Sequence, residues 1–266
     1  MYTHGDAPYA ADQAIRLEAQ MKSVPSDAEF VVFVGDLRKA GDAIPCRVEE
    51  YEAVSRLFRF STVPVFVLIG DNDANDCPNI ADGQKFWNDN FLNFESRYWN
   101  HTFAIRRQDE YPDNFAFTHK KSLFIGLNII GGVTRDTIEW EVRLSAEAMW
   151  TINMIRDYLN ILRQTGTTSN VGRIVIFGHA DPGGRHAPFF QPIASFIDNE
   201  LKNQVPILYV NGDKHEWTYT TSFYGKSSWL RVGVEGLATD PLLKVTIDGN
   251  GNTIDPVQAF VIDRRL

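Results

Sequence analysis

Four apolar segments of this sequence are each followed by a glycine and then by a side chain that can bind a metal ion. The four steps are Gly35-Asp36, Gly70-Asp71, Gly178-His179 and Gly212-Asp213. A strand fixes the backbone, glycine permits a sharp exit turn, and the next side chain projects into the crevice at the carboxyl edge of the sheet. A single Gly-Asp pair is usually an ordinary turn. Four such steps in one chain predict a shared site.

The residue types at these positions indicate which ions the site would hold. Hard carboxylates with a few imidazoles suit Mn, Fe, Zn or Mg. Two metal ions that share a carboxylate are suited to phosphoryl transfer. We therefore expect one or two divalent metal ions as cofactors, and a small-molecule or phosphorylated substrate.

The order of these steps along the chain forms a longer pattern. The blocks are Asp6-Ala7-Pro8, Gly35-Asp36, Gly70-Asp71-Asn72-Asp73, Gly178-His179 and Gly212-Asp213-Lys214-His215. This order resembles the calcineurin-like metallophosphoesterase superfamily, whose pattern is D-x-H, G-D, G-N-H-D/E, H and G-H-x-H. The segment 70–79 is similar to a divergent subgroup with G-D-N-D. The resemblance implies a four-layer α/β/β/α sandwich with two central mixed β-sheets, formed by a single domain over residues 1–266.

The resemblance also implies a role for each block. Asp36 would bridge two metal ions. The remaining ligands would be Asp71, His179 and Asp213 for one metal position, and Asp6 and His215 for the second.

Four residues depart from the family pattern. Asp71 and Asp213 replace an asparagine and a histidine ligand of the family by carboxylates, and the other two departures are Pro8 and Asn72. Pro8 stands where the family has a histidine ligand, which leaves the second metal position one ligand short. Asn72 stands where the family has a histidine that contacts phosphate and assists the leaving group. An amide can donate a hydrogen bond but cannot act as a general acid near neutral pH. Such assistance contributes about 10²–10⁴-fold, so its loss slows reactions with poor leaving groups most.

Two further residues are candidates for contact with the substrate. Arg38 follows Asp36 by two positions, and its guanidinium could bind a phosphate; the alternative is an arginine that opens a surface loop. His186 lies seven positions after His179 and could replace the missing acid. It could instead contact metal or substrate, or be an ordinary loop histidine. The candidate catalytic residues are therefore Asn72, His186 and Arg38.

Three function hypotheses follow from these residues. The first is a metal-dependent phosphoesterase that hydrolyses a phosphate monoester or diester by attack of a metal-bound hydroxide. The second, motivated by Pro8 and Asn72, is a catalytically impaired relative that binds a metal, ligand or partner through the same crevice. The third keeps the scaffold but uses a single metal ion to hydrolyse another kind of bond.

Apolar runs and helical repeats indicate the elements that position these residues. The clearest strands are expected at 30–34, 64–69, 122–128, 173–177 and 206–210. Their near-continuous apolar character is typical of strands covered on both faces. Apolar residues recur at helical spacing over 10–24 and 142–162, so the sequence predicts an α/β protein.

The remaining segments are less regular. Further strands are expected at 229–235, 242–247 and 259–262, at the edge of a second sheet, with a tight turn at 248–251. Residues 71–101 lack strong periodicity and are expected to form a functional loop. Its aromatic residues are expected to pack in the core or a lid rather than to form a stacking platform; they are Trp87, Phe91, Phe94, Tyr98 and Trp99.

Composition excludes some classes of protein. The chain has 266 residues, of which 44% are hydrophobic and 23% are charged, as in soluble globular proteins. A net charge of −8 argues against a nucleic-acid-binding surface. No apolar run is long enough for a membrane span, and no signal peptide is visible. The compartment and the oligomeric state stay open, and Cys46 and Cys77 could equally form a disulfide or stay as two thiols.

Overall fold

Two mixed β-sheets form the centre of the protein. The computed structural model describes residues 1–40, 44–165, 172–248 and 253–265. In this part of the chain, one sheet has the order β12-β11-β1-β2-β3 and the other the order β4-β5-β6-β7-β8-β10-β9. The first sheet consists of β1 (Tyr2–His4), β2 (Val31–Phe33), β3 (Val65–Val67), β11 (Leu243–Ile247) and β12 (Phe260–Asp263). The second consists of β4 (Arg106–Arg107), β5 (Phe115–His119), β6 (Ser122–Gly126), β7 (Arg173–Phe177), β8 (Ile207–Asn211), β9 (Thr218–Thr220) and β10 (Trp229–Gly233).

Parallel strands at the centre of each sheet bring their carboxyl ends to one edge. In the first sheet β1, β2 and β3 are parallel, with Thr3 aligned with Val32 and Val32 with Phe66. In the second sheet β6, β7 and β8 are parallel. Residues that follow these strands therefore gather at the same edge of each sheet.

Alternate residues of the strands face two different cores. Phe30 and Val32 pack between the two sheets, in a buried cluster that also contains Phe117 of the second sheet. Val31 and Phe33 lie in the other core cluster, which includes residues of the helices. This double burial explains the continuous apolar runs of the sequence.

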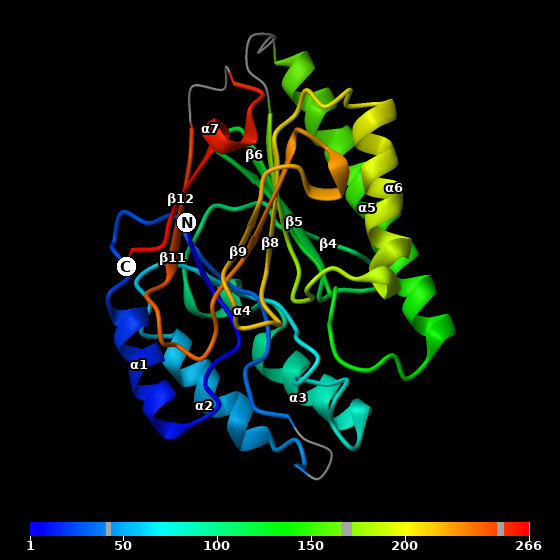
Figure 1. The fold of residues 1–266 in the computed structure, drawn as a ribbon. Coiled ribbons are helices and arrows are strands. Elements are labelled where there is room, and N and C mark those ends of the chain that lie inside the picture. Colours follow the sequence, from blue (N-terminus) through cyan, green and yellow to red (C-terminus); the bar gives the residue numbers. More distant parts are fainter. Residues whose placement is uncertain (41–43, 166–171, 249–252, 266) are drawn as a thin grey trace.

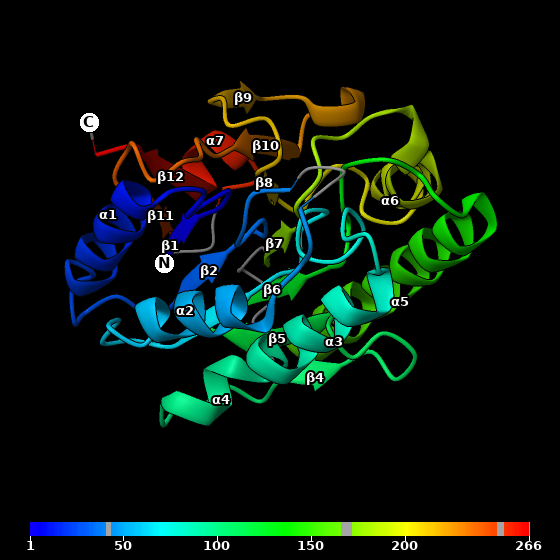
Figure 2. The same ribbon diagram turned by 90° about the horizontal axis from the view of Figure 1, so that it is seen from below.

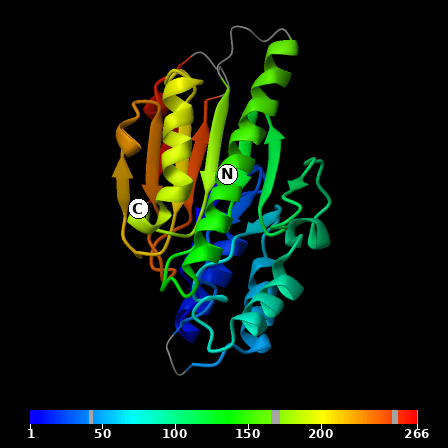
Figure 3. The same ribbon diagram turned by 90° about the vertical axis from the view of Figure 1, so that its right-hand side faces the viewer.

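Helices cover the strands on two sides. They are α1 (Ala11–Lys22), α2 (Val48–Phe58), α3 (Ile80–Phe91), α4 (Phe94–Tyr98), α5 (Thr137–Gln164), α6 (Ala187–Asn199) and α7 (Pro256–Ala259). Figure 1 shows the fold, and Figure 2 shows α1 and α2 on one side of the strands and α5 and α6 on the other. In Figure 3, α5 and α6 lie side by side in front of the second sheet. This mixed α/β arrangement is compatible with the expected α/β sandwich.

The predicted strands agree with the structure to within two residues at each end. The expected helices at 10–24 and 142–162 correspond to α1 and α5. The C-terminal strands do not form one sheet edge together, which corrects the sequence prediction: β10 pairs in the second sheet, whereas β11 and β12 extend the first. The turn expected at 248–251 lies outside the described residues beyond Asp248.

Most of the segment 71–101 is helical, so the prediction of one long functional loop was wrong. Asn79 caps α3 by accepting a hydrogen bond from the N–H of Ala81. Trp87 and Phe91, one turn apart, are both buried, as is Phe94 of α4. These three aromatic residues pack in the core, as expected. Only the part before α3 remains as a loop near the strand ends.

Helix α5 also carries a fully buried glutamate, Glu147. Its Oε1 accepts a hydrogen bond of 3.2 Å from Asn114. Its Oε2 has no hydrogen-bond partner among the described residues. Burial raises the pKa of Glu147 to about 8, against the opposing charge of Arg143. The folded protein therefore holds a proton on Glu147 at neutral pH, which the unfolded chain releases.

Glu147→Gln is expected to alter the pH dependence of stability. Because the pKa of Glu147 is higher in the folded state than in the unfolded chain, its protonation stabilises the fold at low pH. That contribution declines as the pH rises between the two pKa values, by up to about 1.4 kcal/mol per pH unit for one proton. The variant should lose this decline and be more stable than wild type near pH 8. Urea unfolding from pH 5 to pH 8 measures the effect, and parallel pH profiles of the two proteins would contradict it.

Candidate metal centre

All six expected ligands lie at the carboxyl ends of strands. Asp6, Asp36 and Asp71 follow β1, β2 and β3, whereas His179 follows β7, and Asp213 and His215 follow β8. Two groups of ligand atoms each lie within 4.8 Å of one another: Asp6, Asp36 and His179, and Asp71, His179 and Asp213. The structure thus brings together side chains from both sheets.

The first candidate metal position is formed by His179 and the carboxylates around it. His179 Nε2 lies 3.0 Å from Asp71 Oδ1 and 3.3 Å from Asp36 Oδ1. Asp213 completes the group, and its Oδ2 accepts a hydrogen bond of 2.9 Å from the N–H of Asp181. Neighbouring ligand atoms around a cation with bonds of about 2.1 Å are separated by about 3.0 to 3.4 Å. The observed spacing therefore fits a small divalent cation.

His215, expected as a ligand of the second metal ion, belongs to neither of the two groups of ligand atoms. His215 Nε2 is 3.4 Å from Asp6 Oδ1. The second oxygen of Asp36, Oδ2, accepts a hydrogen bond of 3.0 Å from Tyr9 Oη. The carboxylate of Asp36 thus lies between His179 and Tyr9, and the residue common to both groups of ligand atoms is His179.

Two buried atoms of the site have no hydrogen-bond partner among the described residues. His179 Nδ1 donates to the carbonyl oxygen of Val34 at 2.8 Å, because a carbonyl can only accept. Nε2 then faces the carboxylates, and it makes no contact of hydrogen-bond geometry with any described residue. Asp6 Oδ2 is also buried without a hydrogen-bond partner in the described part of the chain. A backbone carbonyl that orients a histidine in this way is typical of metal ligands.

The electrostatics of the cluster favour a positive charge at its centre. Burial opposes the charge of His179, but Asp36 and Asp71 raise its pKa well above the ordinary value for histidine. Burial also raises the pKa of Asp36, partly offset by His179. Asp71 is affected by burial in the same direction, but the contact with His179 and the N–H of Gly131 lower its pKa overall. A proton on His179 and a metal ion therefore compete for the same place.

Several of the expected ligands have a left-handed backbone conformation. Four of them have positive φ: Asp6 at 55°, Asp36 at 61°, Asp213 at 77° and His215 at 56°. This left-handed conformation is uncommon for residues other than glycine, and such strained conformations cost of order 1–3 kcal/mol each. Strain of this kind clusters at functional sites, where the surrounding structure enforces it.

Two glycines are required because the exits of β2 and β3 pass very close to each other. A Cβ atom on Gly70 would lie 2.1 Å from Asp36 Oδ1, and one on Gly35 would lie 2.9 Å from His179 Nδ1. Gly35 has a φ of 95°, as expected for a glycine in a turn. In the step Gly212-Asp213, by contrast, the left-handed residue is Asp213, the expected ligand. Glycine therefore serves close approach at Gly70 rather than the sharp turn predicted.

Asp73 holds the exits of β2 and β3 together. Its carboxylate is fully buried and accepts hydrogen bonds from three backbone N–H groups, those of Asp36 (3.0 Å), Leu37 (2.7 Å) and Gly70 (2.8 Å). Its carbonyl oxygen accepts a hydrogen bond of 2.7 Å from Tyr51 Oη. Asp73 thus positions Asp36, the residue expected to bridge two metal ions.

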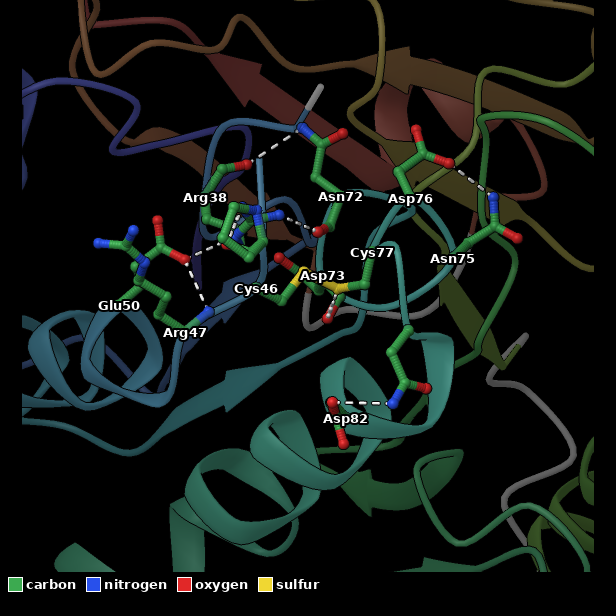
Figure 4. Close-up of a disulfide and its surroundings, with 12 residues drawn as sticks. Arg38, Cys46, Arg47, Glu50, Asn72, Asp73, Asn75, Asp76, Cys77 and Asp82 are labelled. Atoms are coloured by element: carbon green, nitrogen blue, oxygen red, sulfur yellow. Dashed lines mark hydrogen bonds and ion pairs between the residues drawn. A yellow bond between two sulfur atoms is a disulfide. The ribbon is translucent and has the colours of Figure 1, made fainter. Parts of the chain in front are cut away.

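Asn72 and Arg38 support the same loop (Figure 4). The amide of Asn72 donates to Tyr9 Oη at 3.2 Å and to the carbonyl oxygen of Arg38 at 3.1 Å. The guanidinium of Arg38 is buried, and it contacts Glu50 Oε2 at 2.9 Å and the carbonyl oxygen of Asn72 at 3.0 Å. Asn72 lies beside the metal positions, whereas the guanidinium of Arg38 is already engaged within the loop.

His186 lies outside both ligand groups of the described chain. It is fully buried; its Nδ1 accepts from the N–H of Gly183 at 3.1 Å, and its Nε2 donates to the carbonyl oxygen of Ile130 at 2.9 Å. Burial lowers the pKa of His186 to about 4. The ring is therefore neutral and has both nitrogens occupied, so this placement gives no support to a role in proton transfer.

Sequence reasoning did not identify Tyr9 or assign a role to Asp73. Tyr9 directly follows the altered D-x-H block, and its ring lies 5.5 Å from that of His215. The signal in the sequence that could have identified Tyr9 was its position directly after Pro8, which stands in place of the family's histidine. Asp73 was quoted only as the last member of its block, because its role depends on contacts with the backbone of another strand.

A disulfide joins the loops after β2 and β3. Cys46 and Cys77 are bonded, which resolves the alternative that the sequence left open, and Figure 4 shows the bond beside Asp73. Cys77 is buried, and its sulfur lies 3.8 Å from Tyr51 Oη. Both loops carry metal-site residues, so the disulfide limits how far they can separate.

Comparison with known proteins gives no independent assignment. No protein-family model matches the sequence, and no curated protein is significantly similar to it. The family resemblance therefore rests on the quoted motifs and stays a hypothesis. Among the helices of the described chain, none combines the length and the apolar character needed to cross a membrane.

Replacing both cysteines is expected to destabilise the fold. The bond closes a loop with a sequence separation of 31 residues, for which chain entropy gives about 3 to 4 kcal/mol. The Cys46→Ser, Cys77→Ser double variant should lose roughly this free energy of unfolding, as measured by urea denaturation. Reductant should destabilise wild type to the same level and leave the double variant unchanged. A loss below about 0.5 kcal/mol would show that the bond does not constrain the unfolded chain.

Proposed function

We propose that the protein is a metal-dependent phosphoesterase with a sandwich of the calcineurin-like type. The observation that carries this proposal is the meeting of two groups of possible ligand atoms, Asp6-Asp36-His179 and Asp71-His179-Asp213, with the Asp36 carboxylate 3.3 Å from the shared His179. A carboxylate shared by two metal ions is the arrangement that suits hydrolysis of phosphate esters. Buried histidine and aspartate atoms without hydrogen-bond partners, at His179 and Asp6, support the same proposal.

The residue types support hard cations. Carboxylate oxygens with imidazole nitrogens suit Mn, Fe, Zn or Mg. Bound cations would supply a water nucleophile at neutral pH and would neutralise the charge that develops on phosphorus. The role of the protein is to fix the ligands: Asp73 orients Asp36, and the carbonyl group of Val34 orients His179.

The proposal includes a preference for substrates with good leaving groups. Asn72 occupies the place of the family's histidine, and its amide cannot protonate a leaving oxygen near neutral pH. His186 is neutral and engaged with backbone groups, so it offers no replacement. Esters whose leaving group departs as a stable anion should therefore react faster than alkyl esters.

A second candidate function is favoured by the surroundings of Asn72. Its amide is held by Tyr9 Oη and by the carbonyl oxygen of Arg38, so it points into the protein's own network. A protein with this arrangement could bind a metal ion, a ligand or a partner in the crevice without turnover. Metal content combined with activity separates the two functions.

The test is metal analysis of the purified protein together with hydrolysis of an activated aryl phosphate monoester and diester. Wild type should bind two equivalents of metal and hydrolyse at least one ester. Asp36→Asn should lose the bridging charge and reduce turnover by about 10²-fold or more, given that even outer-shell changes cost 10–100-fold. Asp89→Asn, at an exposed position paired with Lys85, is the matched control and should keep wild-type activity.

Other results would favour the alternatives. Tight binding of metal with no hydrolysis of either ester, even with added Mn, would contradict the phosphoesterase proposal and favour the binding protein. Equal activity of Asp36→Asn and wild type would contradict the bridging role of Asp36. Turnover confined to compounds without phosphate would favour hydrolysis of another bond.

A further inference from the structure

A cavity of about 410 Å³ lies next to the candidate metal centre, between α3 and the first turns of α5. Its volume is in the range of about 300 to 1,000 Å³ that is usual for small-molecule sites. Ile69 and Asn75, on either side of Asp71 in the chain, line one wall. Ile130 lines another, and the N–H of the next residue, Gly131, donates to Asp71 Oδ1 at 3.2 Å. Two loops therefore border both the cavity and the expected ligand Asp71.

The most buried lining residues are held in place by one another. Asp113, Trp140 and Arg143 are all buried. The side-chain amide of Asn128 donates to Asp113 Oδ2, and the backbone carbonyl oxygen of Asn128 accepts from Arg143. Arg143 Nε also donates to Glu139 Oε1 at 2.7 Å. These bonds fix the side chains before a ligand arrives, so that less conformational entropy is lost on binding.

The charge of the lining favours an uncharged ligand group. Four carboxylate side chains and two guanidinium side chains line the cavity: Glu110, Asp113, Asp136, Glu139, Arg135 and Arg143. This excess of negative charge repels a phosphate group, whereas cations at the metal centre would attract it. Two of the carboxylates are already engaged, because Glu139 pairs with Arg143 and Asp136 accepts from N–H groups at the start of α5. The lining therefore suits neither an anion nor a strongly cationic group.

Amide side chains indicate which uncharged group fits. Four of them line the cavity: Asn75, Gln84, Asn88 and Asn128. An amide carries N–H donors and an acceptor oxygen, and a hydroxyl group likewise donates and accepts. Gln84 donates to Asn88 Oδ1 at 3.0 Å, and this one bond leaves both amides with further donor and acceptor capacity. The pair can therefore bind neighbouring hydroxyl groups of a sugar.

The largest aromatic side chain of the cavity does not offer a stacking surface for a nucleobase. Trp140 is only 3% exposed. The guanidinium groups of Arg143 and Arg185 lie over its ring, 5.2 Å and 5.7 Å from the ring centre. A base that stacks needs a free aromatic face, whereas a sugar is held mainly by hydrogen bonds to its hydroxyl groups. The lining therefore favours a sugar over a base.

We propose that this cavity binds the sugar of a sugar phosphate, with the phosphate group at the metal centre. The inference rests on the proposed function, whose substrate class it names. Hydrolysis forms a P–O bond to the oxygen of water and breaks the P–O bond to the sugar, whose oxygen takes up a proton from that water. No oxidant or reductant takes part. A sugar 1-phosphate suits a site without a general acid, because the ring oxygen makes the anomeric oxygen a better leaving group than an alkyl oxygen.

Binding of free sugars tests the cavity separately from the metal centre, because free sugars carry no phosphate. Saturation-transfer NMR of the purified protein with glucose, galactose, mannose and N-acetylglucosamine should show binding of at least one of them at millimolar concentration. Gln84→Leu and Asn88→Leu should each weaken that binding about 10-fold, the effect of one lost hydrogen bond. Gln258→Leu changes an exposed glutamine of α7 and is the matched control, with binding like wild type. Urea unfolding of each variant separates a loss of binding from a loss of fold.

The 1-phosphate of the sugar that binds most tightly tests the link between the cavity and the metal centre. Wild type should hydrolyse this ester to free sugar and inorganic phosphate. Gln84→Leu should raise its KM about 10-fold and leave kcat nearly unchanged, because a contact made equally in the ground state and the transition state affects only KM.

The outcomes separate this proposal from the function. Sugar binding that is weakened in Gln84→Leu and Asn88→Leu, without turnover of any phosphate ester, would support the sugar site and contradict the phosphoesterase. Turnover of an aryl ester with no binding of any of the four sugars, or with equal binding by wild type and both cavity variants, would overturn the sugar site alone. Neither sugar binding nor turnover would overturn both.

Discussion

Concentrated negative charge in a buried volume is the constraint on which the site depends. Asp6, Asp36 and Asp71 are all buried, and Asp213 lies beside them around His179. Like charges at this spacing repel strongly when water is excluded, and a proton or a cation bound in the cluster relieves that repulsion. A protonated His179 can play that part in the absence of metal, and bound metal ions would do so more completely. The strained backbone of the ligand residues is consistent with a geometry selected for binding rather than for stability.

The two-sheet architecture is what allows such a cluster to form. Parallel strands of both sheets end at one edge, and the bond from His179 to the carbonyl oxygen of Val34 joins the two sheets at that point. The loops after β2 and β3 are then fixed twice, by the buried carboxylate of Asp73 and by the disulfide between Cys46 and Cys77. The Asp73 carboxylate and the disulfide together hold Asp36, the residue proposed to be shared by the two metal ions, in place against the repulsion of the neighbouring carboxylates.

The sequence predicted those features that follow from local pattern. Strands buried on both faces appear as continuous apolar runs, and ligands that directly follow strands share a Gly-Asp or Gly-His step, so β7 and His179 could both be predicted. Features that depend on contacts between distant segments could not. Helix α3 was not predicted, although its residues Trp87 and Phe91 lie one turn apart and are both buried. Tyr9 matches no motif, and the engagement of Arg38 and His186 with backbone carbonyl groups is apparent only in three dimensions.

Anomalous X-ray diffraction from crystals of the protein soaked in Mn²⁺ tests the central claim most directly. We expect two anomalous peaks roughly 3.5–4 Å apart, the separation typical of two-metal sites, with the carboxylate of Asp36 between them. One peak should lie against Asp71, His179 and Asp213, and the other against Asp6 and His215. No peak at saturating Mn²⁺, or peaks that do not contact Asp36, would contradict the account of a bridged metal centre.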